Sequence, residues 1–331
     1  MASRNVPNER QRAKRKPSRA RRAIGIIGWL LVAACGLCFG GLIGYIGFAS
    51  DGVAMRTISA IVTREATPAR AFPGRNSITI LALGADQDRD RRKRITNRSA
   101  RSDTIMVVKV DFDRMRADAV SIPRDTLVRI PGHGWGKVNA AHALGGVELA
   151  AKTVSDLLGE IPIDHVAVID YVGFQRLIDA IGGVELYVDK RLKYDDNWGD
   201  LHIDLQPGFQ HLTGEQAMGF VRYRHTDSDF KRIERQQVFV QALKDKLKSP
   251  GVWVRAPDVL NKASKMVASS LTYEQLLALA TYVRSLPQDA VQMKTLPVRD
   301  GRGTYLTVDK EESKKILREL SFWESYTYSK R

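Results

Sequence analysis

The chain has 331 residues, of which 44% are hydrophobic, and its formal net charge is +15. This composition excludes a mainly disordered chain and allows one sizeable core. Nine basic residues and one acidic residue precede Ala23, so much of the excess charge lies in a polar N-terminal tail. A charge concentrated in this way argues against a nucleic-acid-binding domain, and we expect no nucleic-acid partner.

Residues 24–48 contain no charged side chain. At about 1.5 Å per residue, a helix of this length crosses a hydrocarbon core of about 30 Å, which predicts one transmembrane helix. A cleaved signal peptide is the alternative, but the apolar run is longer than usual and no small-residue cleavage pattern clearly ends it. Because Lys and Arg favour the cytoplasmic side, residues 1–23 predict a cytoplasmic tail. The protein is then a single-pass cell-membrane protein whose main domain is extracytoplasmic.

Both cysteines of the chain, Cys35 and Cys38, fall inside this apolar span, so their spacing does not indicate a redox or zinc site. An exported domain without cysteine depends on core burial rather than disulfides. Gly36, Gly40 and Gly44 follow a small-xxx-small spacing, which would let two such helices pair in a homodimer. Glycine is common in membrane helices in any case, so a monomeric helix is the alternative.

The remaining residues divide into a juxtamembrane stalk at 49–76, a main domain at 77–250 and a C-terminal part at 251–331 that packs on it. Apolar runs and alternation predict strands at 78–83, 104–110, 117–122, 165–169, 184–188 and 291–298. Helical periodicity predicts helices at 146–158, 171–181, 213–223, 229–248, 273–286 and 310–322. This alternation predicts an α/β fold with a mixed sheet flanked by helices.

Acidic and basic side chains lie at the ends of three predicted strands. Asp86 follows the first strand, Asp103 enters the second and Arg124 follows the third. Connections at strand ends gather ligand groups in α/β folds, so these residues would converge if the strands are neighbours. Two carboxylates can hold Mg²⁺, although aspartates at such positions are more commonly turn or cap residues.

A second cluster begins at Arg222 and Arg224 and continues through Asp229, Arg232 and Gln236. On a helix, the last three share one face. Arginine pairs bidentately with phosphate, so several arginines together can bind a pyrophosphate. A solvated basic helix with local ion pairs is the alternative.

Other catalytic patterns are missing from the sequence. No histidine spacing supports zinc, and neither a G-x-S-x-G elbow nor a Walker-type loop occurs. His142 and His165 lie in apolar contexts that favour packing roles, whereas His225 follows the arginine cluster and is a candidate for the pocket lining.

The motifs occur in a fixed order: Gly84–Asp86, Arg101–Thr104, Ser121–Asp125, Lys137–Ala141, Asp179–Val184, Leu212–Ala217, Arg222–Arg224 and Asp229–Gln236. In this order, residues from about 78 to 248 resemble the LytR-CpsA-Psr family of cell-wall ligases. Two positions depart from the family pattern. His142 stands where a tyrosine is more usual, and Lys231 replaces a glycine, which puts acceptor or polymer preference in question more than pyrophosphate binding.

The resemblance implies an α/β/α domain with a long apolar pocket for a polyprenyl chain and an arginine-lined mouth for its pyrophosphate. It assigns Asp86 and Asp103 to Mg²⁺. It assigns the pyrophosphate contacts to Arg124, Arg224, Arg232 and Gln236, supported by Arg101 and Arg222. We expect the apolar faces of residues 147–158 and 168–181 to line the lipid pocket.

The activity that the resemblance implies is a Mg²⁺-dependent phosphotransferase that attaches an undecaprenyl-pyrophosphate-linked glycopolymer to peptidoglycan and releases undecaprenyl phosphate. Arg124 would act with Asp103 or Asp229, one of which would be the general base. The alternative is a non-enzymatic regulator or scaffold of envelope assembly that binds the same lipid carrier. The motifs do not separate these two functions.

Overall fold

The computed structural model describes residues 66–85, 102–196, 201–223, 229–255, 259, 267–287 and 289–323. All of them belong to one compact unit, Thr57–Arg331. The predicted cytoplasmic tail and transmembrane helix, and most of the predicted stalk, lie outside the described residues. Within the described ranges, no helix combines the length and the apolar character needed to cross a membrane.

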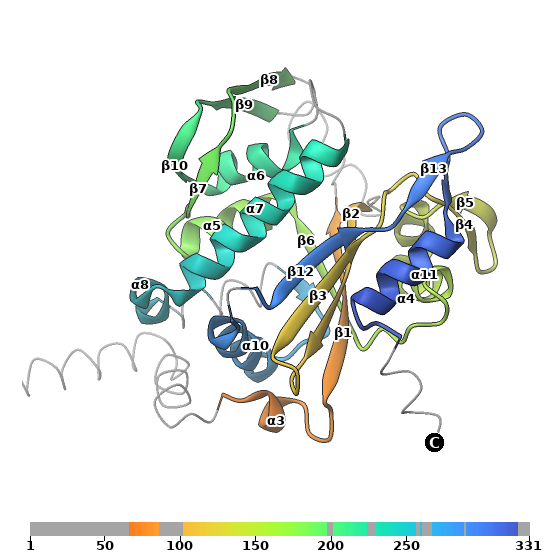
Figure 1. Ribbon diagram of the computed structural model, residues 1–331, viewed down its shortest axis with the longest axis horizontal. Helices are drawn as coiled ribbons and strands as arrows, with labels where there is room; N and C mark the ends of the chain where they lie inside the picture. The colour runs from red at the N-terminus through yellow and green to blue at the C-terminus, as the bar shows by residue number, and fades with distance from the viewer. Residues whose placement is uncertain are drawn as a thin grey trace, which may run out of the picture. The chain divides into compact units, whose positions relative to one another are not determined.

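A six-stranded mixed sheet forms the centre of this unit, with strand order β11-β6-β1-β2-β3-β12 (Figure 1). Its strands are β1 (Ser77–Ala85), β2 (Ser102–Asp111), β3 (Arg116–Ser121), β6 (His165–Asp170), β11 (Val267–Ser269) and β12 (Val291–Thr295). Strands β1, β2 and β3 are antiparallel, while β6 and β12 run parallel to their partners β1 and β3. The chain beyond residue 250 therefore supplies both edge strands.

Strand β1 has both of its faces covered. Leu81 and Leu83 belong to an apolar cluster on one face, whereas Ala82 and Gly84 line a cavity on the other. Successive side chains of a strand point to opposite faces, so alternate residues of this short apolar run pack into the cluster on one face and line the cavity on the other.

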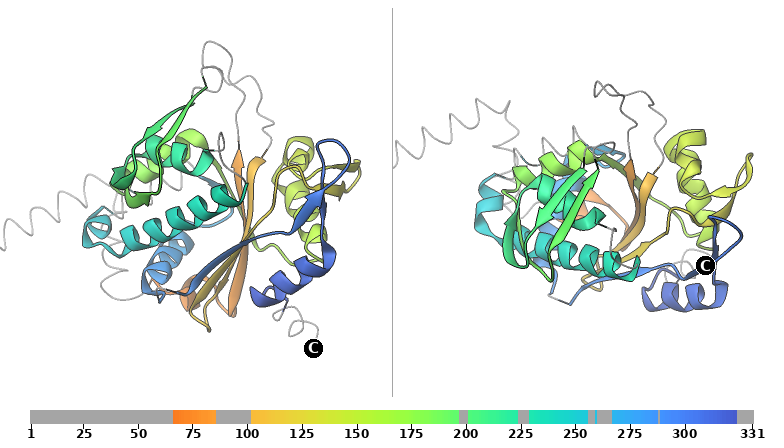
Figure 2. Two further views of the ribbon diagram at one scale, coloured as in Figure 1. Left: turned by 45° about the horizontal axis from the view of Figure 1, so that its top comes forward. Right: turned by 90° about the horizontal axis from the view of Figure 1, so that it is seen from above.

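Helices α4 (Ala140–Leu157) and α11 (Lys310–Glu319) cover the first face of the sheet (Figure 2, right). Val154 of α4 and Leu317 of α11 pack in one cluster with Leu81 and Val107 of the sheet. Two hairpins lie on the same side: β4 (Leu127–Ile130) with β5 (Gly134–Lys137), and β13 (Val298–Asp300) with β14 (Leu306–Val308).

Helix α10 (Tyr273–Ser285) packs on the second face, where Tyr282 joins a cluster with Ile78 and Val110. A lobe built around its own apolar cluster lies on the same side (Figure 1, upper left). Its elements are α5 (Tyr171–Ala180), β7 (Val184–Val188), β8 (Leu192–Asp196), β9 (Leu201–Leu205), β10 (Gly208–Leu212), α6 (Gly214–Arg222), α7 (Asp229–Lys248) and α8 (Pro250–Val254). A short helix, α3 (Pro68–Ala71), precedes β1 and contacts α10.

The predicted α/β fold with a mixed sheet flanked by helices is confirmed. The predicted helix at 146–158 begins earlier, at Ala140, but Gly145 and Gly146 interrupt it with non-helical backbone. Gly146 has a φ of 67°, a conformation that side chains with a Cβ rarely adopt, so the apolar periodicity starts again only after it. The predicted strand at 291–298 is in fact divided into β12 and β13.

Candidate functional site

A cavity with a volume of about 560 Å³ lies between the second face of the sheet and the helical lobe. Its floor is formed by the sheet, including Thr104 and Met106 of β2, and its opposite wall by apolar side chains of α5, α6 and α7. Thr104 is exposed although it lies within a central strand, because its side chain faces the open space of the cavity. The apolar wall side chains are Phe174, Met218, Val221, Phe239 and Val240.

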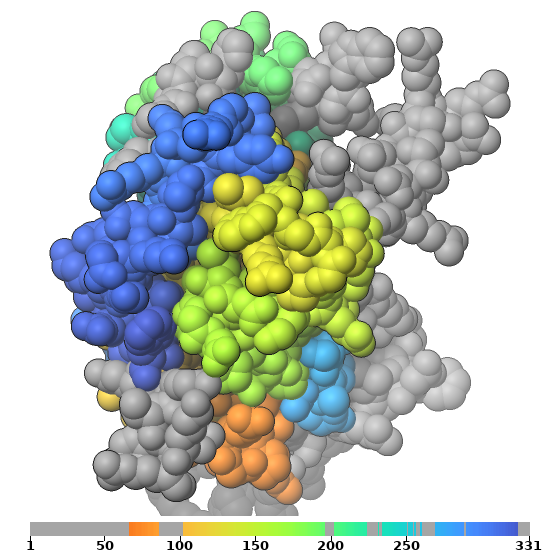
Figure 3. Space-filling model, turned by 90° about the vertical axis from the view of Figure 1, so that its right-hand side faces the viewer, coloured from red at the N-terminus to blue at the C-terminus, as the bar shows by residue number. Residues whose placement is uncertain are grey.

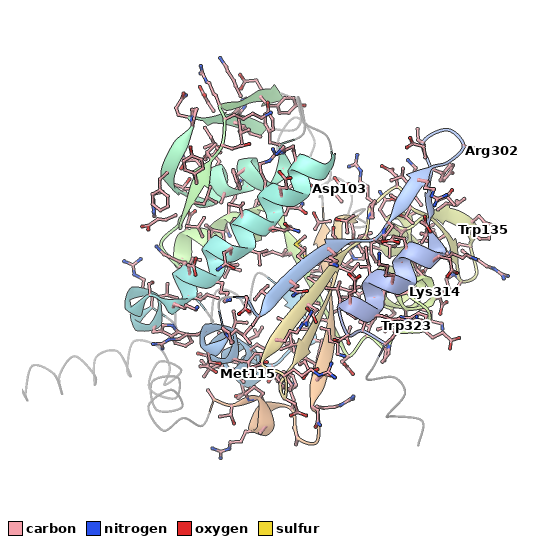
Figure 4. The ribbon with its side chains drawn as sticks, in the orientation of Figure 1. Asp103, Met115, Trp135, Arg302, Lys314 and Trp323 are labelled. Atoms are coloured by element: carbon pink, nitrogen blue, oxygen red, sulfur yellow. The ribbon has the colours of Figure 1, made fainter. Side chains whose placement is uncertain are left out.

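Charged side chains gather at one end of this cavity. Arg124, in the loop after β3, donates from Nη1 to Oδ1 of Asp103 at 2.9 Å, and Asp103 lies near the start of β2 (Figure 4). The hydroxyl of Tyr171 lies 3.4 Å from the second oxygen of Asp103. Both partners hold the Asp103 carboxylate in a fixed orientation, with 26% of its side chain still exposed.

Helices α6 and α7 complete the charged end. Arg222, the last residue of α6, stacks its guanidinium over the ring of Tyr171, with Cζ 4.0 Å from the ring centroid. Gln236 of α7 also lines the cavity. Arg235, which is 4% exposed, donates from Nη2 to the carbonyl oxygen of Tyr223 at 2.5 Å and therefore fastens α7 to the end of α6.

The electrostatic surroundings of Arg124 keep it charged. Burial would lower the pKa of Arg124, but the carboxylates of Asp103 and Asp125 outweigh burial and raise the pKa above its ordinary value. Burial would likewise raise the pKa of Asp125, yet the hydrogen bond and charge of Lys137, followed by Arg124, hold it below its ordinary value. Lys137 Nζ lies 2.6 Å from Asp125 Oδ1.

The structure brings four of the predicted site residues around one cavity: Asp103, Arg124, Arg222 and Gln236. Asp86, Arg101, Arg224 and His225 lie outside the described residues. Asp229 and Arg232 belong to α7, but their side chains are not described. The roles of all these residues stay predictions.

A model of the LytR_cpsA_psr family matches residues 48–321, which is most of the chain. The chain belongs to the LytR_cpsA_psr family.

Two curated relatives show how the chain resembles known proteins. The polyisoprenyl-teichoic acid–peptidoglycan teichoic acid transferase TagT of Bacillus subtilis strain 168 is 28% identical over 321 residues, which cover 95% of this chain and 97% of TagT. The regulatory protein MsrR of Staphylococcus aureus strain COL is 30% identical over 254 residues, which cover 73% of this chain and 74% of MsrR.

A solved structure of TagT with bound octaprenyl pyrophosphate lipid is also similar. It is 29% identical, and the match covers 75% of this chain and 90% of that one with a TM-score of 0.56. This LytR_cpsA_psr chain therefore shares its fold with TagT, whose solved structure contains a bound polyprenyl pyrophosphate.

One predicted feature of this LytR_cpsA_psr site is wrong. Residues 147–158 do not line the cavity, because α4 packs on the opposite face of the sheet, where Val154 belongs to the cluster of Leu81 and Val107. The second predicted stretch, 168–181, does contribute to the lining with Ile169 and Phe174. Helices α6 and α7 supply the rest of the helical wall.

Tyr171 is a member of this LytR_cpsA_psr site that the sequence patterns did not reveal. Its hydroxyl reaches Asp103 and its ring supports Arg222. Tyr171 follows Asp170, which caps α5 by accepting a hydrogen bond from the Gly173 nitrogen at 2.6 Å. The local signal is a tyrosine directly after a capping aspartate at the end of β6, but this signal alone does not distinguish a site residue from a core residue, because the contact with Asp103 depends on the pairing of β6 with β1.

The histidines with described side chains have structural contacts. His165 lies 3.2 Å from Ser270 Oγ and packs edge-on against Phe72, and burial lowers its pKa. His142 Nδ1 lies 2.9 Å from the hydroxyl of Ser102, the residue before Asp103. His142 therefore supports the start of β2 from α4.

A metal site made by protein alone is not found in the described part of the chain, where no three His, Cys, Asp or Glu side chains are arranged to hold a cation. Asp103 takes one hydrogen bond on each oxygen, which leaves further lone pairs on its carboxylate. Mg²⁺ commonly binds one or two carboxylates and completes its shell with water and phosphate oxygens. Asp103 is thus able to share such a cation with a bound phosphate.

Proposed function

We propose that this protein is a phosphotransferase that attaches an undecaprenyl-pyrophosphate-linked glycopolymer to peptidoglycan. The observation that carries this proposal is a single cavity whose apolar interior leads to the Asp103–Arg124 ion pair and Arg222. A polyprenyl chain needs a dry, apolar space, and its pyrophosphate needs oriented cations at the end of that space. The name of TagT and the octaprenyl pyrophosphate in its solved structure support the same assignment.

In the proposed reaction, a peptidoglycan hydroxyl attacks the sugar-side phosphorus of the pyrophosphate. A new P–O bond forms to the acceptor oxygen, and the bond from that phosphorus to the bridging oxygen breaks. The acceptor proton passes to a carboxylate, with Asp103 and Asp229 as the candidates, and undecaprenyl phosphate leaves with the bridging oxygen. Such a step depends on positioning and charge stabilisation rather than on a covalent enzyme intermediate.

The described residues contribute orientation and charge to this step. Arg124 is held by Asp103 before any ligand binds, so its remaining guanidinium donors are already directed when a phosphate arrives. Arg222 is held by its stacking on Tyr171, and Gln236 adds amide donors. The predicted contacts from Arg101, Arg224 and Arg232 belong to the same proposal.

A Mg²⁺ ion held by Asp103, and by Asp86 as predicted from the sequence, would neutralise charge on the phosphate oxygens. We also propose that residues 24–48 anchor the chain in the cell membrane with the domain outside, because peptidoglycan lies outside the cytoplasm. Pairing of two such anchors through their glycine spacing belongs to this proposal. Protection of the domain from protease added to protoplasts would contradict this orientation.

Replacement of Arg124 tests the proposed activity. R124A should lower the transfer of labelled lipid-linked glycan to peptidoglycan by about 100- to 1000-fold, the usual effect of losing one oriented donor at a developing charge. R124K should recover only part of the activity, because lysine keeps the charge but loses the bidentate fork. Thermal unfolding should change little, since the Arg124 side chain is 40% exposed.

The matched control is R191A, which removes a comparable Arg–Asp pair that lies away from the cavity, with both side chains about half exposed. It should transfer like the wild type. Assays with EDTA and with restored Mg²⁺ test the cation separately. Full activity of R124A would remove Arg124 from the site.

The name of MsrR, a regulatory protein, favours a second candidate, in which the chain binds a polyprenyl pyrophosphate but regulates or scaffolds envelope assembly. The same assay separates the two functions. A wild-type chain that binds the lipid pyrophosphate but forms no phosphodiester with peptidoglycan in the presence of Mg²⁺ would favour the regulator.

A further inference from the structure

An exposed tryptophan stands on the β4–β5 hairpin, on the side of the sheet opposite to the helical lobe. Trp135 of β5 is 72% exposed, and it projects outward on the same side as Arg302 in the loop between β13 and β14 (Figure 4). The two hairpins adjoin on one face of the molecule (Figure 3). Tryptophan is enriched at binding interfaces, because its ring offers a large apolar contact area.

Strand β5 leads from Trp135 toward the charged end of the cavity. Lys137 and Trp135 are two residues apart on β5 and so face the same side of the hairpin, about 7 Å apart along the strand. Lys137 binds Asp125, which is adjacent to Arg124, and its Nζ lies 5.7 Å from the ring centroid of Tyr305.

The second hairpin is joined to the same charged end. The nitrogen of Leu306 donates to the carbonyl oxygen of Asp125 at 3.0 Å, and Leu306 itself lines the cavity. Tyr305, the preceding residue, is 38% exposed. We call Lys137, Tyr305 and Trp135 the hairpin strip. It leads from Asp125 at the charged end of the cavity outward along β5.

The chemistry of the hairpin strip suits a sugar chain. The C–H faces of pyranose rings stack on aromatic rings, whose faces carry negative charge density. A lysine ammonium donates to sugar hydroxyls, amide oxygens or carboxylates, and exposed Arg129 is the cross-strand partner of Trp135. A protein partner would need about 800 Å² of contact on each side, whereas the hairpin strip offers only two aromatic rings.

We propose that the hairpin strip binds the acceptor glycan strand of peptidoglycan and leads its hydroxyl toward Arg124. The inference rests on the proposed transferase function. In that function the donor lipid fills the cavity and its pyrophosphate fills the charged end, so the acceptor arrives from outside the cavity, and the surface that borders Asp125 offers it an approach. The amide and carboxyl groups of a peptidoglycan strand complement Lys137 and Arg129.

Binding of soluble, uncrosslinked peptidoglycan strands to the full chain in detergent, without donor, tests the proposal. W135A should weaken binding by about tenfold, an effect typical of a lost stacking contact. W135F should retain most of the affinity because it keeps an aromatic face. F209A is the matched control, because Phe209 is also 72% exposed and also lies on a two-stranded hairpin, β7–β10, but belongs to the helical lobe.

Two further readouts distinguish acceptor binding at the hairpin strip from an indirect effect of W135A on the cavity. Binding of octaprenyl pyrophosphate should be equal in W135A and in the wild type, and in transfer assays W135A should raise KM for the acceptor while kcat stays close to the wild-type value. Unchanged strand binding in W135A, equal losses in W135A and F209A, or a loss of donor binding in W135A would each overturn the proposal.

The design separates this inference from the proposed function. Strand binding is measured without donor, so a chain that binds strands through Trp135 but never transfers would disprove the transferase and leave the glycan site standing. A chain that transfers normally but binds strands independently of Trp135 would disprove the hairpin strip alone.

Discussion

Arg124 is fixed by acids on two sides before a substrate arrives. Its Nη1 is 2.9 Å from Asp103, its Nε is 3.6 Å from Asp125, and Asp125 is held in turn by Lys137. A long arginine side chain loses considerable rotamer freedom when it binds a ligand. The contacts with Asp103 and Asp125 already restrict the rotamers of Arg124 in the folded protein, so less entropy is lost on binding. The linked side chains Lys137, Asp125, Arg124 and Asp103 therefore hold the Arg124 guanidinium in place at the charged end of the cavity.

Removal of the Lys137 contact predicts a change in the pH dependence of stability. Because Lys137 helps to hold the pKa of Asp125 below 3.8, the stabilisation is complete above pH 3.8 and is lost as the pH falls through the lowered folded-state pKa. K137M should thus be less stable than the wild type by about 0.5–1 kcal/mol at pH 7, as expected for a partly exposed pair. Urea unfolding at several pH values measures the difference.

The difference between K137M and the wild type should shrink toward zero at the acidic end of that series. The control K152M breaks the Lys152–Asp156 pair on the exposed surface of α4 and should give a smaller change with pH. A K137M difference that is the same at pH 3 and pH 7 would contradict the linkage to Asp125.

Residues at strand ends could be predicted from the sequence, whereas residues that support them could not. Asp103 and Arg124 were identified because acids and arginines beside apolar runs are visible in a linear pattern. Tyr171 follows a strand as well, but a tyrosine at the start of an apolar helix is also an ordinary core residue. Its role depends on the parallel pairing of β6 with β1, which no local pattern contains.

At the scale of elements, two motifs of the family pattern build the helical lobe rather than the site chemistry. Asp179 Oδ1 accepts a hydrogen bond from the nitrogen of Gly214 at 2.7 Å, which ties α5 to the start of α6. Thr213 and Gln216 form a capping box at the same start. These contacts hold α6 so that Met218, Val221 and Arg222 reach the cavity.

Gly214 should tolerate no side chain. A Cβ at this position would lie 2.0 Å from the carbonyl oxygen of Gln175, which is backbone and cannot rotate away. We expect G214A to destabilise the protein by at least about 2 kcal/mol, since overpacking against backbone forces the two helices apart. The control is G251A in α8, where a Cβ would meet no atom within 4 Å. That change should stabilise slightly, by about 0.4–1 kcal/mol.

Urea unfolding of both variants measures these effects. Because α6 carries Arg222, G214A should also weaken octaprenyl pyrophosphate binding, whereas G251A should not. Equal stability of the two variants would mean that α5 and α6 are not in close contact at Gly214.

The long elements were predictable because their periodicity is strong. The helix at 229–248 and the strand at 184–188 have the predicted bounds, and β1 and β2 extend the predicted strands by a few residues. The short hairpins β4–β5 and β8–β9 were not predicted, since four- or five-residue strands with glycine or charged residues carry little apolar alternation. Their pairing comes from turns and from packing on the larger elements.

On the scale of the whole molecule, topology decides which helices line the cavity. Helices α4 and α5 are both amphipathic, and the central sheet is apolar on both faces, so the sequence alone could not assign either helix to a face. The chain places α4 against Leu81 and Val107, and α5 against the cavity. The sheet thereby separates a closely packed apolar cluster on one face from the cavity on the other.

In the proposed function, the apolar wall of the cavity contacts the lipid chain and its charged end contacts the pyrophosphate, so changes at the two places should affect lipid binding differently. V240W introduces a large ring into the cavity wall on α7, where it should displace methylene groups of a bound lipid. Loss of even two buried methylenes corresponds to about a tenfold loss in affinity. V240W should therefore weaken the binding of octaprenyl pyrophosphate by about tenfold. It should weaken the binding of geranyl pyrophosphate, which has a much shorter chain, far less. R124A should weaken both by a similar factor because both carry the same pyrophosphate.

The matched control is V238W, because Val238 lies two residues away on α7 and is 41% exposed outside the cavity. It should leave both affinities unchanged. Competition binding with prenyl pyrophosphates of increasing length, measured on the full chain in detergent, gives the comparison. If V240W weakened the binding of the short and long lipids equally, the lipid chain would not lie between the sheet and α7. If R124A weakened the binding of the long lipid only, Arg124 would not contact the pyrophosphate.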